Sequence, residues 1–96
     1  MRVININGTS DNTCSCGSWL EHWKNFGKQT LPHYCLEKNC IKAPEVGAHV
    51  QKDGNTDRSW YIIPLCKDCN AKTSSSLEIS DSITLVSANI SETCGK

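Results

Sequence analysis

The sequence predicts a single α+β domain, residues 1–96, that is held together largely by its cysteines. Three observations support this: helix-like and strand-like segments follow one another, the chain is short, and it contains seven cysteines but only three tryptophans, two tyrosines and one phenylalanine. A chain of this size buries only about 60–65% of the surface that its unfolded form exposes. Its hydrophobic core is therefore marginal, and the cysteines are the expected additional source of stability.

The N-terminal part of the chain predicts a short strand followed by a helix. Residues 3–6 are mainly β-branched and precede the polar run 7–13, which has turn chemistry. A helix is expected from Trp19 to Phe26, because Ser18 can cap its first amides and Gly27 is placed to end it. Its apolar residues recur at helical spacing: Trp19, Leu20, Trp23 and Phe26.

The rest of the chain predicts a hairpin, a short helix and two further strands. The expected elements are strands over residues 45–50, 59–65, 77–79 and 83–86 and a two-turn helix over 70–76. The polar run 52–57 contains an Asp-Gly pair of the kind found in hairpin turns. The serine-rich stretch before residue 77 could be a linker, but the two apolar segments after it favour one domain.

Two close pairs of cysteines flank the predicted hairpin: Cys35 with Cys40, and Cys66 with Cys69. The sequence has no apolar run of signal-peptide length and none of about 18 residues, so we expect no membrane partner and a cytoplasmic, reducing location. Paired thiols in that location are typically metal ligands or redox groups rather than disulfides. Four thiolates can close a tetrahedral zinc site without an open position, so this Zn²⁺ would be structural. The alternative is four buried or redox-active cysteines.

The order of these residues resembles the HNH endonuclease family, whose domains have a ββα-metal fold of the treble-clef class. The resemblance covers residues 35–73 and includes both cysteine pairs, the segment Ala48-His49-Val50, and Asn70 directly after the last cysteine. It implies an HNH-like zinc core over about residues 35–76. It also implies that His49 is the general base that activates water against a phosphodiester, and that Asn70 helps to hold a catalytic Mg²⁺ or Mn²⁺.

The sequence departs from the pattern of that family at two positions. Ala48 stands where an acidic metal ligand is common, and Tyr61 lies near the place of the asparagine that orients the base. Asn55 or Asp57 could take over that orienting role from the loop. For His49 the alternative is a structural histidine whose ring hydrogen-bonds near the zinc knuckle.

Three cysteines lie outside the two pairs: Cys14, Cys16 and Cys94. Together with His22 or His33 they would make a four-ligand set for a second zinc, and free or buried cysteines are the alternative. His22 could also move in as a ligand of the catalytic cation. Packing beside Trp19 and Trp23 is the favoured interpretation for His22.

Charge and aromatic residues bear on the partner of this domain. Ten basic and ten acidic residues leave no net charge, which argues against a tight, sequence-independent grip on nucleic acid. Trp19, Trp23 and Trp60 could stack on bases, but we expect them in the core. The favoured function is a zinc-binding HNH-like domain that acts as a divalent-metal-dependent nuclease on DNA or RNA. The alternative is a catalytically inactive structural zinc module that binds protein or nucleic acid.

Overall fold

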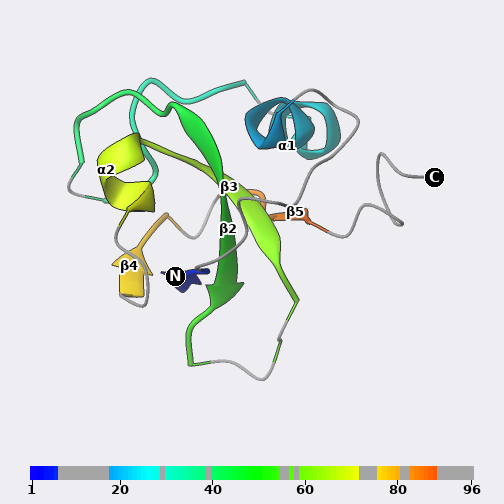
Figure 1. Cartoon of the computed structure of the whole chain (residues 1–96), viewed down its shortest axis with the longest axis vertical. Coiled ribbons are helices and arrows are strands. Elements are labelled where there is room, and N and C mark those ends of the chain that lie inside the picture. Colours follow the sequence, from blue (N-terminus) through cyan, green and yellow to red (C-terminus); the bar gives the residue numbers. More distant parts are fainter. Residues whose placement is uncertain are drawn as a thin grey trace.

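The structure of the chain, a computed structural model, describes residues 1–6, 18–28, 30–38, 40–54, 57, 59–71, 76–80 and 83–88. These residues form five strands and two helices (Figure 1), which confirms the predicted α+β class. In chain order the elements are β1 (Arg2–Asn5), α1 (Trp19–Gly27), β2 (Val46–Lys52), β3 (Tyr61–Leu65), α2 (Lys67–Asn70), β4 (Ser76–Glu78) and β5 (Val86–Ser87). Neither of these helices is long and apolar enough to cross a membrane.

One antiparallel sheet contains all five described strands, in the order β4-β1-β2-β3-β5. β2 and β3 form the predicted hairpin, in which His49 lies opposite Ile62. β1 inserts between β2 and β4, so that Val3 lies opposite Lys52 on one side and opposite Leu77 on the other. The sheet therefore joins the first residues of the chain to residues near position 77.

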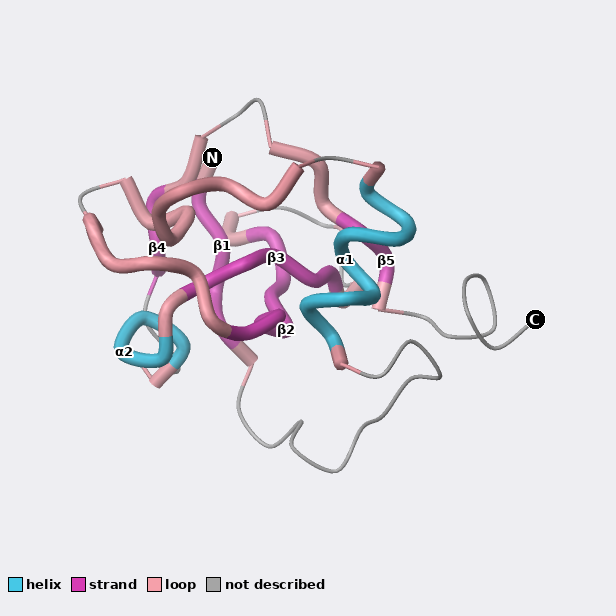
Figure 2. Tube along the Cα trace, turned by 90° about the horizontal axis from the view of Figure 1, so that it is seen from above, coloured by secondary structure: helices cyan, strands magenta, loops and turns pink. Residues whose placement is uncertain are grey.

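The two faces of the sheet have different coverings, because side chains alternate between the faces along each strand. We call the face covered by α1 the helix face, where Ile62 and Val86 pack with Trp23. We call the opposite face the cysteine face. Its buried cluster includes Val3, Ala48, Val50, Ile63 and Leu65 together with Cys35, Cys66 and Cys69. Figure 1 and Figure 2 show α1 and α2 on either side of the β2–β3 hairpin.

α1 is the helix that the sequence predicts. The Oγ of Ser18 accepts a hydrogen bond from the N–H of Glu21 at 3.1 Å, and the helix ends at Gly27. Its first turn lies directly against β2 at Gly47, where an added Cβ would be 2.4 Å from the carbonyl carbon of Trp19. Only glycine allows the backbones of helix and strand to approach this closely.

Two buried rings of α1 are bonded to the chain around β5. The Nε2 of His22 lies 2.8 Å from the carbonyl oxygen of Ser87, and the Nε1–H of Trp23 donates to the carbonyl oxygen of Thr84 at 3.0 Å. Both side chains are fully buried. The ring of His22 also packs edge to face on Trp19, with centroids 4.9 Å apart, which confirms the packing expected for His22.

The short helix after the hairpin lies earlier than predicted. α2 begins at Lys67, and Asn70 is its last residue rather than its first. The sulfur of Cys66 caps this helix by accepting a hydrogen bond from the N–H of Cys69. A helix start is recognised in a sequence by a capping side chain with an oxygen, such as Ser, Thr, Asp or Asn, so a cysteine cap gives no such signal. Residues 72–75 of the predicted helix lie outside the described part of the chain.

The hairpin and the last strand also differ in detail from the prediction. The ladder between β2 and β3 begins only at Tyr61, and Trp60, which precedes it, is 40% exposed. The expectation that Trp60 is a core residue is therefore wrong, whereas Trp23 is fully buried as expected and Trp19 is half-buried. β5 covers Val86–Ser87 instead of residues 83–86, because only Val86 and Ser87 of this segment pair with β3.

Candidate metal centre

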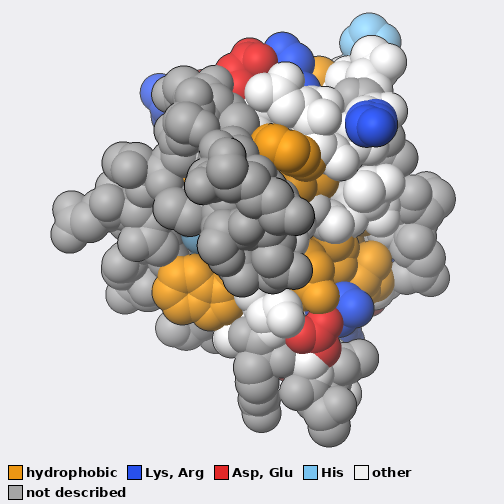
Figure 3. Space-filling view, turned by 90° about the vertical axis from the view of Figure 1, so that its right-hand side faces the viewer, with side chains coloured by type: hydrophobic (Ala, Val, Ile, Leu, Met, Phe, Trp, Pro, Cys, Tyr) orange, Lys and Arg blue, Asp and Glu red, His pale blue; other side chains and the backbone are white. Residues whose placement is uncertain are grey.

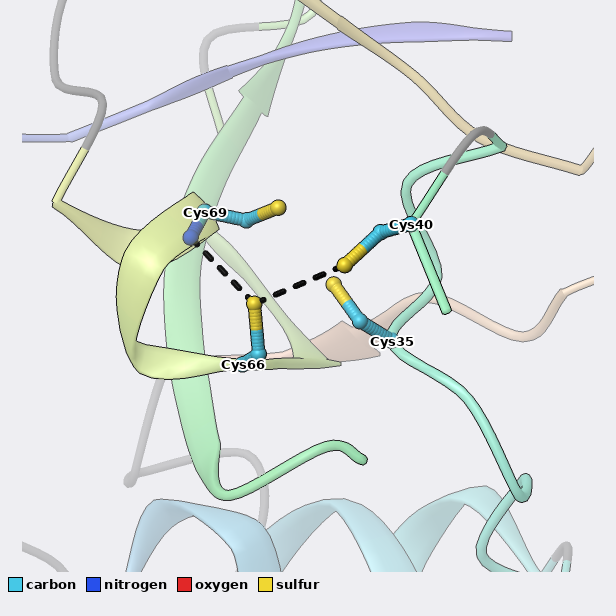
Figure 4. Close-up of side chains that lie close together, drawn as sticks. All are labelled: Cys35, Cys40, Cys66 and Cys69. Carbon is cyan, nitrogen blue, oxygen red and sulfur yellow. Dashed lines mark hydrogen bonds between the residues drawn. The ribbon is translucent and has the colours of Figure 1, made fainter. Parts of the chain in front are cut away.

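The structure brings the four paired cysteines together beside the end of β3 (Figure 4). Their sulfur atoms all lie within 4.8 Å of one another, and the sulfurs of Cys40 and Cys66 are 3.7 Å apart. All four have free thiols. Cys35, Cys66 and Cys69 are buried, and Cys40 is half-buried. The two pairs thus form one compact cluster, as their spacing in the sequence predicts.

The first pair belongs to the loop of residues 35–42, which closes on itself. The N–H of Cys35 donates to the carbonyl oxygen of Lys42 at 2.7 Å, and the N–H of Cys40 donates to the carbonyl oxygen of Glu37 at 3.0 Å. Figure 4 shows that the sulfurs of Cys35 and Cys40 consequently point to the same side, toward the second pair. Two further backbone hydrogen bonds fix this loop to the sheet. The N–H of Leu36 donates to the carbonyl oxygen of Pro64 in β3, and the N–H of Lys38 donates to the carbonyl oxygen of Glu78, which ends β4.

The second pair lies at the start of α2. The sulfur of Cys66 accepts a hydrogen bond from the N–H of Cys69 at 3.4 Å, and the N–H of Asn70 donates to the carbonyl oxygen of Cys66 at 3.0 Å. The turn that closes this pair is therefore the first turn of the helix. The Nζ of Lys42 pairs with the carboxylate of Asp68, which adds an ionic link between the two loops.

The environment of the sulfurs determines their protonation. Burial raises the pKa of the Cys35 and Cys69 thiols. Burial acts in the same direction at Cys66, but the hydrogen bonds that its sulfur accepts, first from the N–H of Cys69, outweigh it and lower its pKa. A bound cation has to displace the protons that Cys35 and Cys69 retain, so metal affinity should weaken as the pH decreases.

The geometry of the cluster fits a tetrahedral metal ion. Zinc–sulfur bonds of about 2.3 Å place the four sulfurs of a tetrahedron roughly 3.8 Å apart. The sulfurs of Cys40 and Cys66 are already at 3.7 Å, and no pair is farther apart than 4.8 Å, so small side-chain adjustments suffice. Thiolate ligands select zinc or iron over Mg²⁺ or Ca²⁺. The cluster could therefore hold a metal ion such as zinc, which is consistent with a zinc domain.

His49 lies on the helix face and not beside the cysteines. Its ring packs edge to face on Trp19, with centroids 4.5 Å apart, and Trp60 is the next ring at 6.1 Å. His49 is 5% exposed, and its Nε2 has no hydrogen-bond partner among the described residues. Burial, and secondarily the nearby His22, lowers the pKa of His49 to about 4. The ring is therefore neutral at neutral pH.

Asn70 lies on the opposite side of the sheet from His49. The Nδ2 of Asn5 in β1 donates to the Oδ1 of Asn70 at 3.2 Å and also to the Asn70 carbonyl oxygen. Asn5 is paired with Val50, a residue of the cysteine face, so the side chain of Asn5 and its partner lie there too. The structure thus does not bring His49 and Asn70 together.

The remaining candidate residues are placed as follows. The carboxylate of Asp57 accepts hydrogen bonds from the hydroxyl of Tyr61 at 2.5 Å and from the N–H of Ser59 at 2.9 Å, so it holds the turn before β3. His33 is exposed. The other candidates lie outside the described residues: Cys14, Cys16, Cys94 and Asn55. The second zinc, which Cys14, Cys16 and Cys94 would help to hold, therefore stays a prediction.

Asn5 is a structurally important residue that the sequence analysis does not single out. It is only 3% exposed and connects β1 to the end of α2. A single asparagine within a β-branched strand is the signal that could have identified it, because a buried amide needs hydrogen-bond partners.

No family model, no curated protein and no solved structure matches the chain. The fold and the cluster define a small α+β domain with a candidate four-cysteine metal centre.

Proposed function

We propose that this chain is a structural zinc module, in which one Zn²⁺ joins two loops and has no catalytic role. The observation that carries the proposal is the convergence of four thiol sulfurs within 4.8 Å, two from the loop 35–42 and two from the start of α2. Four thiolates fill a tetrahedral zinc site and leave no position for water or substrate. The ligands are Cys35, Cys40, Cys66 and Cys69.

The position of the centre indicates what the metal stabilises. α2 has only four residues, and a helix of one turn is not stable alone in water. The loop 35–42 is likewise an irregular segment. Zinc would fasten both to the cysteine face, where Cys35, Cys66 and Cys69 are already part of the buried cluster. In such sites the free energy of metal binding contributes directly to folding.

A treble-clef, HNH-like core is our finer proposal for residues 35–76. Its support is the order of elements: a cysteine loop, the hairpin of β2 and β3, and then α2 with the second pair. Nuclease activity is not part of the proposal, because a general base and a metal ligand must reach the same phosphate. His49 and Asn70 face opposite sides of the sheet.

The partner that we propose is a protein rather than a nucleic acid. Affinity for nucleic acid comes from cationic side chains that neutralise phosphates. Several cations of this chain are instead paired with acids, for example Lys24 with Glu21 and Lys42 with Asp68. Figure 3 shows basic, acidic and hydrophobic side chains interspersed on the face that it draws. DNA affinity at low salt that falls steeply with added salt would overturn this choice of partner.

Native mass spectrometry of the protein tests the zinc proposal directly. We expect at least one zinc per chain, and we expect the zinc of the cluster to be lost in Cys66→Ser and retained in Cys94→Ser, which makes the same substitution outside the cluster. Cobalt replacement in the wild type gives a second measurement, since a tetrahedral thiolate site has a characteristic visible spectrum and needs no variant that folds poorly. Protein purified with ample zinc that contains none would refute the proposal.

Plasmid nicking in Mg²⁺ or Mn²⁺ tests the nuclease alternative. The zinc-loaded protein and its His49→Ala variant are compared at equal concentration. We expect no cleavage that depends on His49, because its ring is enclosed by Trp19 and lies away from Asn70. Cleavage by the wild type that disappears in the variant would show a catalytic function.

A further inference from the structure

The four cysteines of the cluster differ in exposure. Cys35, Cys66 and Cys69 are at most 4% exposed, whereas Cys40 is half-buried. The contact of 3.7 Å between the sulfurs of Cys40 and Cys66 joins the two loops, rather than the two members of one pair (Figure 4). The sulfur of Cys40, the most exposed residue of the cluster, therefore lies next to the sulfur of the buried Cys66 on the other side of the site.

We propose that Cys40 is an oxidation site, at which hydrogen peroxide forms a disulfide between Cys40 and Cys66 and releases the metal. This inference rests on the proposed function, since it concerns how the same centre loses its zinc.

The reaction consists of two displacement steps. The sulfur of Cys40 attacks a peroxide oxygen, so that an S–O bond forms, the O–O bond breaks and hydroxide leaves. The sulfur of Cys66 then attacks the sulfur of Cys40, so that an S–S bond forms, the S–O bond breaks and a second hydroxide leaves. Two thiolates lose two electrons, and the peroxide takes up these electrons and two protons to give two water molecules. Only two of the four ligands remain for the metal.

The contact between the loops and the exposure of Cys40 support this disulfide. An S–S bond of about 2.05 Å requires the sulfurs of Cys40 and Cys66 to approach by about 1.7 Å from their present 3.7 Å. The burial of Cys35 and Cys69 keeps oxidant from reaching their sulfurs first. The product retains a link between the loop 35–42 and α2. Oxidation would thus release the metal while the two loops stay joined.

Tryptic peptide mapping after oxidation tests the inference, because trypsin separates all four cysteines of the cluster. Cys40 falls in residues 39–42 and Cys66 in 59–67, whereas Cys35 falls in 29–38 and Cys69 in 68–72. Zinc-loaded protein is treated with hydrogen peroxide, and released zinc is measured with a chromogenic chelator. Free thiols are blocked before digestion. The same treatment of a Cys14→Ser, Cys16→Ser, Cys94→Ser protein removes the thiols outside the cluster.

We expect a cross-link between peptides 39–42 and 59–67, loss of one zinc per disulfide formed, and reversal of both by dithiothreitol and added zinc. A predominant cross-link between 59–67 and 68–72, or between 29–38 and 39–42, would overturn the inference and leave the zinc module intact. Zinc that stays bound while the disulfide forms would also overturn it. Protein that holds no zinc before peroxide is added would instead refute the proposed function, so the two failures are distinguishable.

Discussion

Replacement of Gly47 by alanine should displace the first turn of α1 from β2. The added Cβ would lie 2.4 Å from the carbonyl carbon of Trp19 and 2.6 Å from the amide nitrogen of Leu20. The shorter distance is about 1 Å below the 3.4 Å at which ordinary van der Waals contact begins. Both atoms belong to the backbone, so no side-chain rotation relieves the overlap. The helix has to move, and the fully buried Trp23 has to move with it.

The expected loss of stability follows from two opposing effects. Adding a methyl group to a well-packed contact costs about 1–3 kcal/mol, and backbone neighbours place Gly47 at the upper end, at about 3 kcal/mol. Alanine also restricts the unfolded chain, which offsets about 0.4–1 kcal/mol. We therefore expect the free energy of unfolding to decrease by about 2–2.6 kcal/mol in Gly47→Ala.

Urea denaturation of the zinc-loaded protein, followed by tryptophan fluorescence, measures this loss. Gly27→Ala is the matched control, because its Cβ would meet a side-chain atom, the Cγ2 of Val86, at 3.0 Å. Alanine also has the higher helix propensity, so we expect the control to stay within about 1 kcal/mol of the wild type. A Gly47→Ala protein as stable as the wild type would refute the close approach of α1 to β2.

Three further substitutions test other contacts in the same urea assay. The pKa of His49 is lowered from 6.5 to about 4 in the folded chain, so between these pH values only the unfolded chain binds a proton on His49. The free energy of unfolding should therefore fall as the pH decreases through this range. In His49→Phe this part of the pH dependence should be missing, and an unchanged pH profile would contradict the assignment. Ser18→Ala should cost about 1 kcal/mol, since the amide of Glu21 loses its acceptor, and Ser18→Thr should restore most of it. Asn5→Ala should cost about 2 kcal/mol, because it removes buried hydrogen bonds to Asn70, whereas equal stability of Asn5→Ala and wild type would show that these bonds contribute nothing.

The elements around the cysteines could be predicted because their signals are local. The hairpin follows from two apolar runs on either side of a polar turn, and α1 follows from helical spacing after the cap at Ser18. The convergence of the two pairs also follows from the sequence, since a hairpin between Cys40 and Cys66 brings its second end, with Cys66, back beside its first end, with Cys40. Each of these inferences needs only neighbouring residues or one reversal of the chain.

The surroundings of His49 could not be predicted, because they depend on contacts between distant segments. Alternation along β2 already separates the side chain of His49 from those of Ala48 and Val50. Which of the two faces carries α1 is decided by the packing of its first turn at Gly47, a contact between residues far apart in the sequence. The same limit applies to Asn5, whose partner Asn70 is near only because β1 inserts beside β2.

The insertion of β1 between β2 and β4 also affects the kinetics of folding. Val3 pairs with Leu77, 74 positions along the chain, and closing such a long loop is slow because its entropy must be lost first. A zinc link between Cys40 and Cys66 bypasses 26 of these positions, which reduces the closure cost by only about 0.4 kcal/mol, or about twofold in rate. We therefore expect the metal to change the refolding rate little and to act mainly by slowing unfolding. What zinc would set is the lifetime of the folded molecule, and not the speed at which it forms.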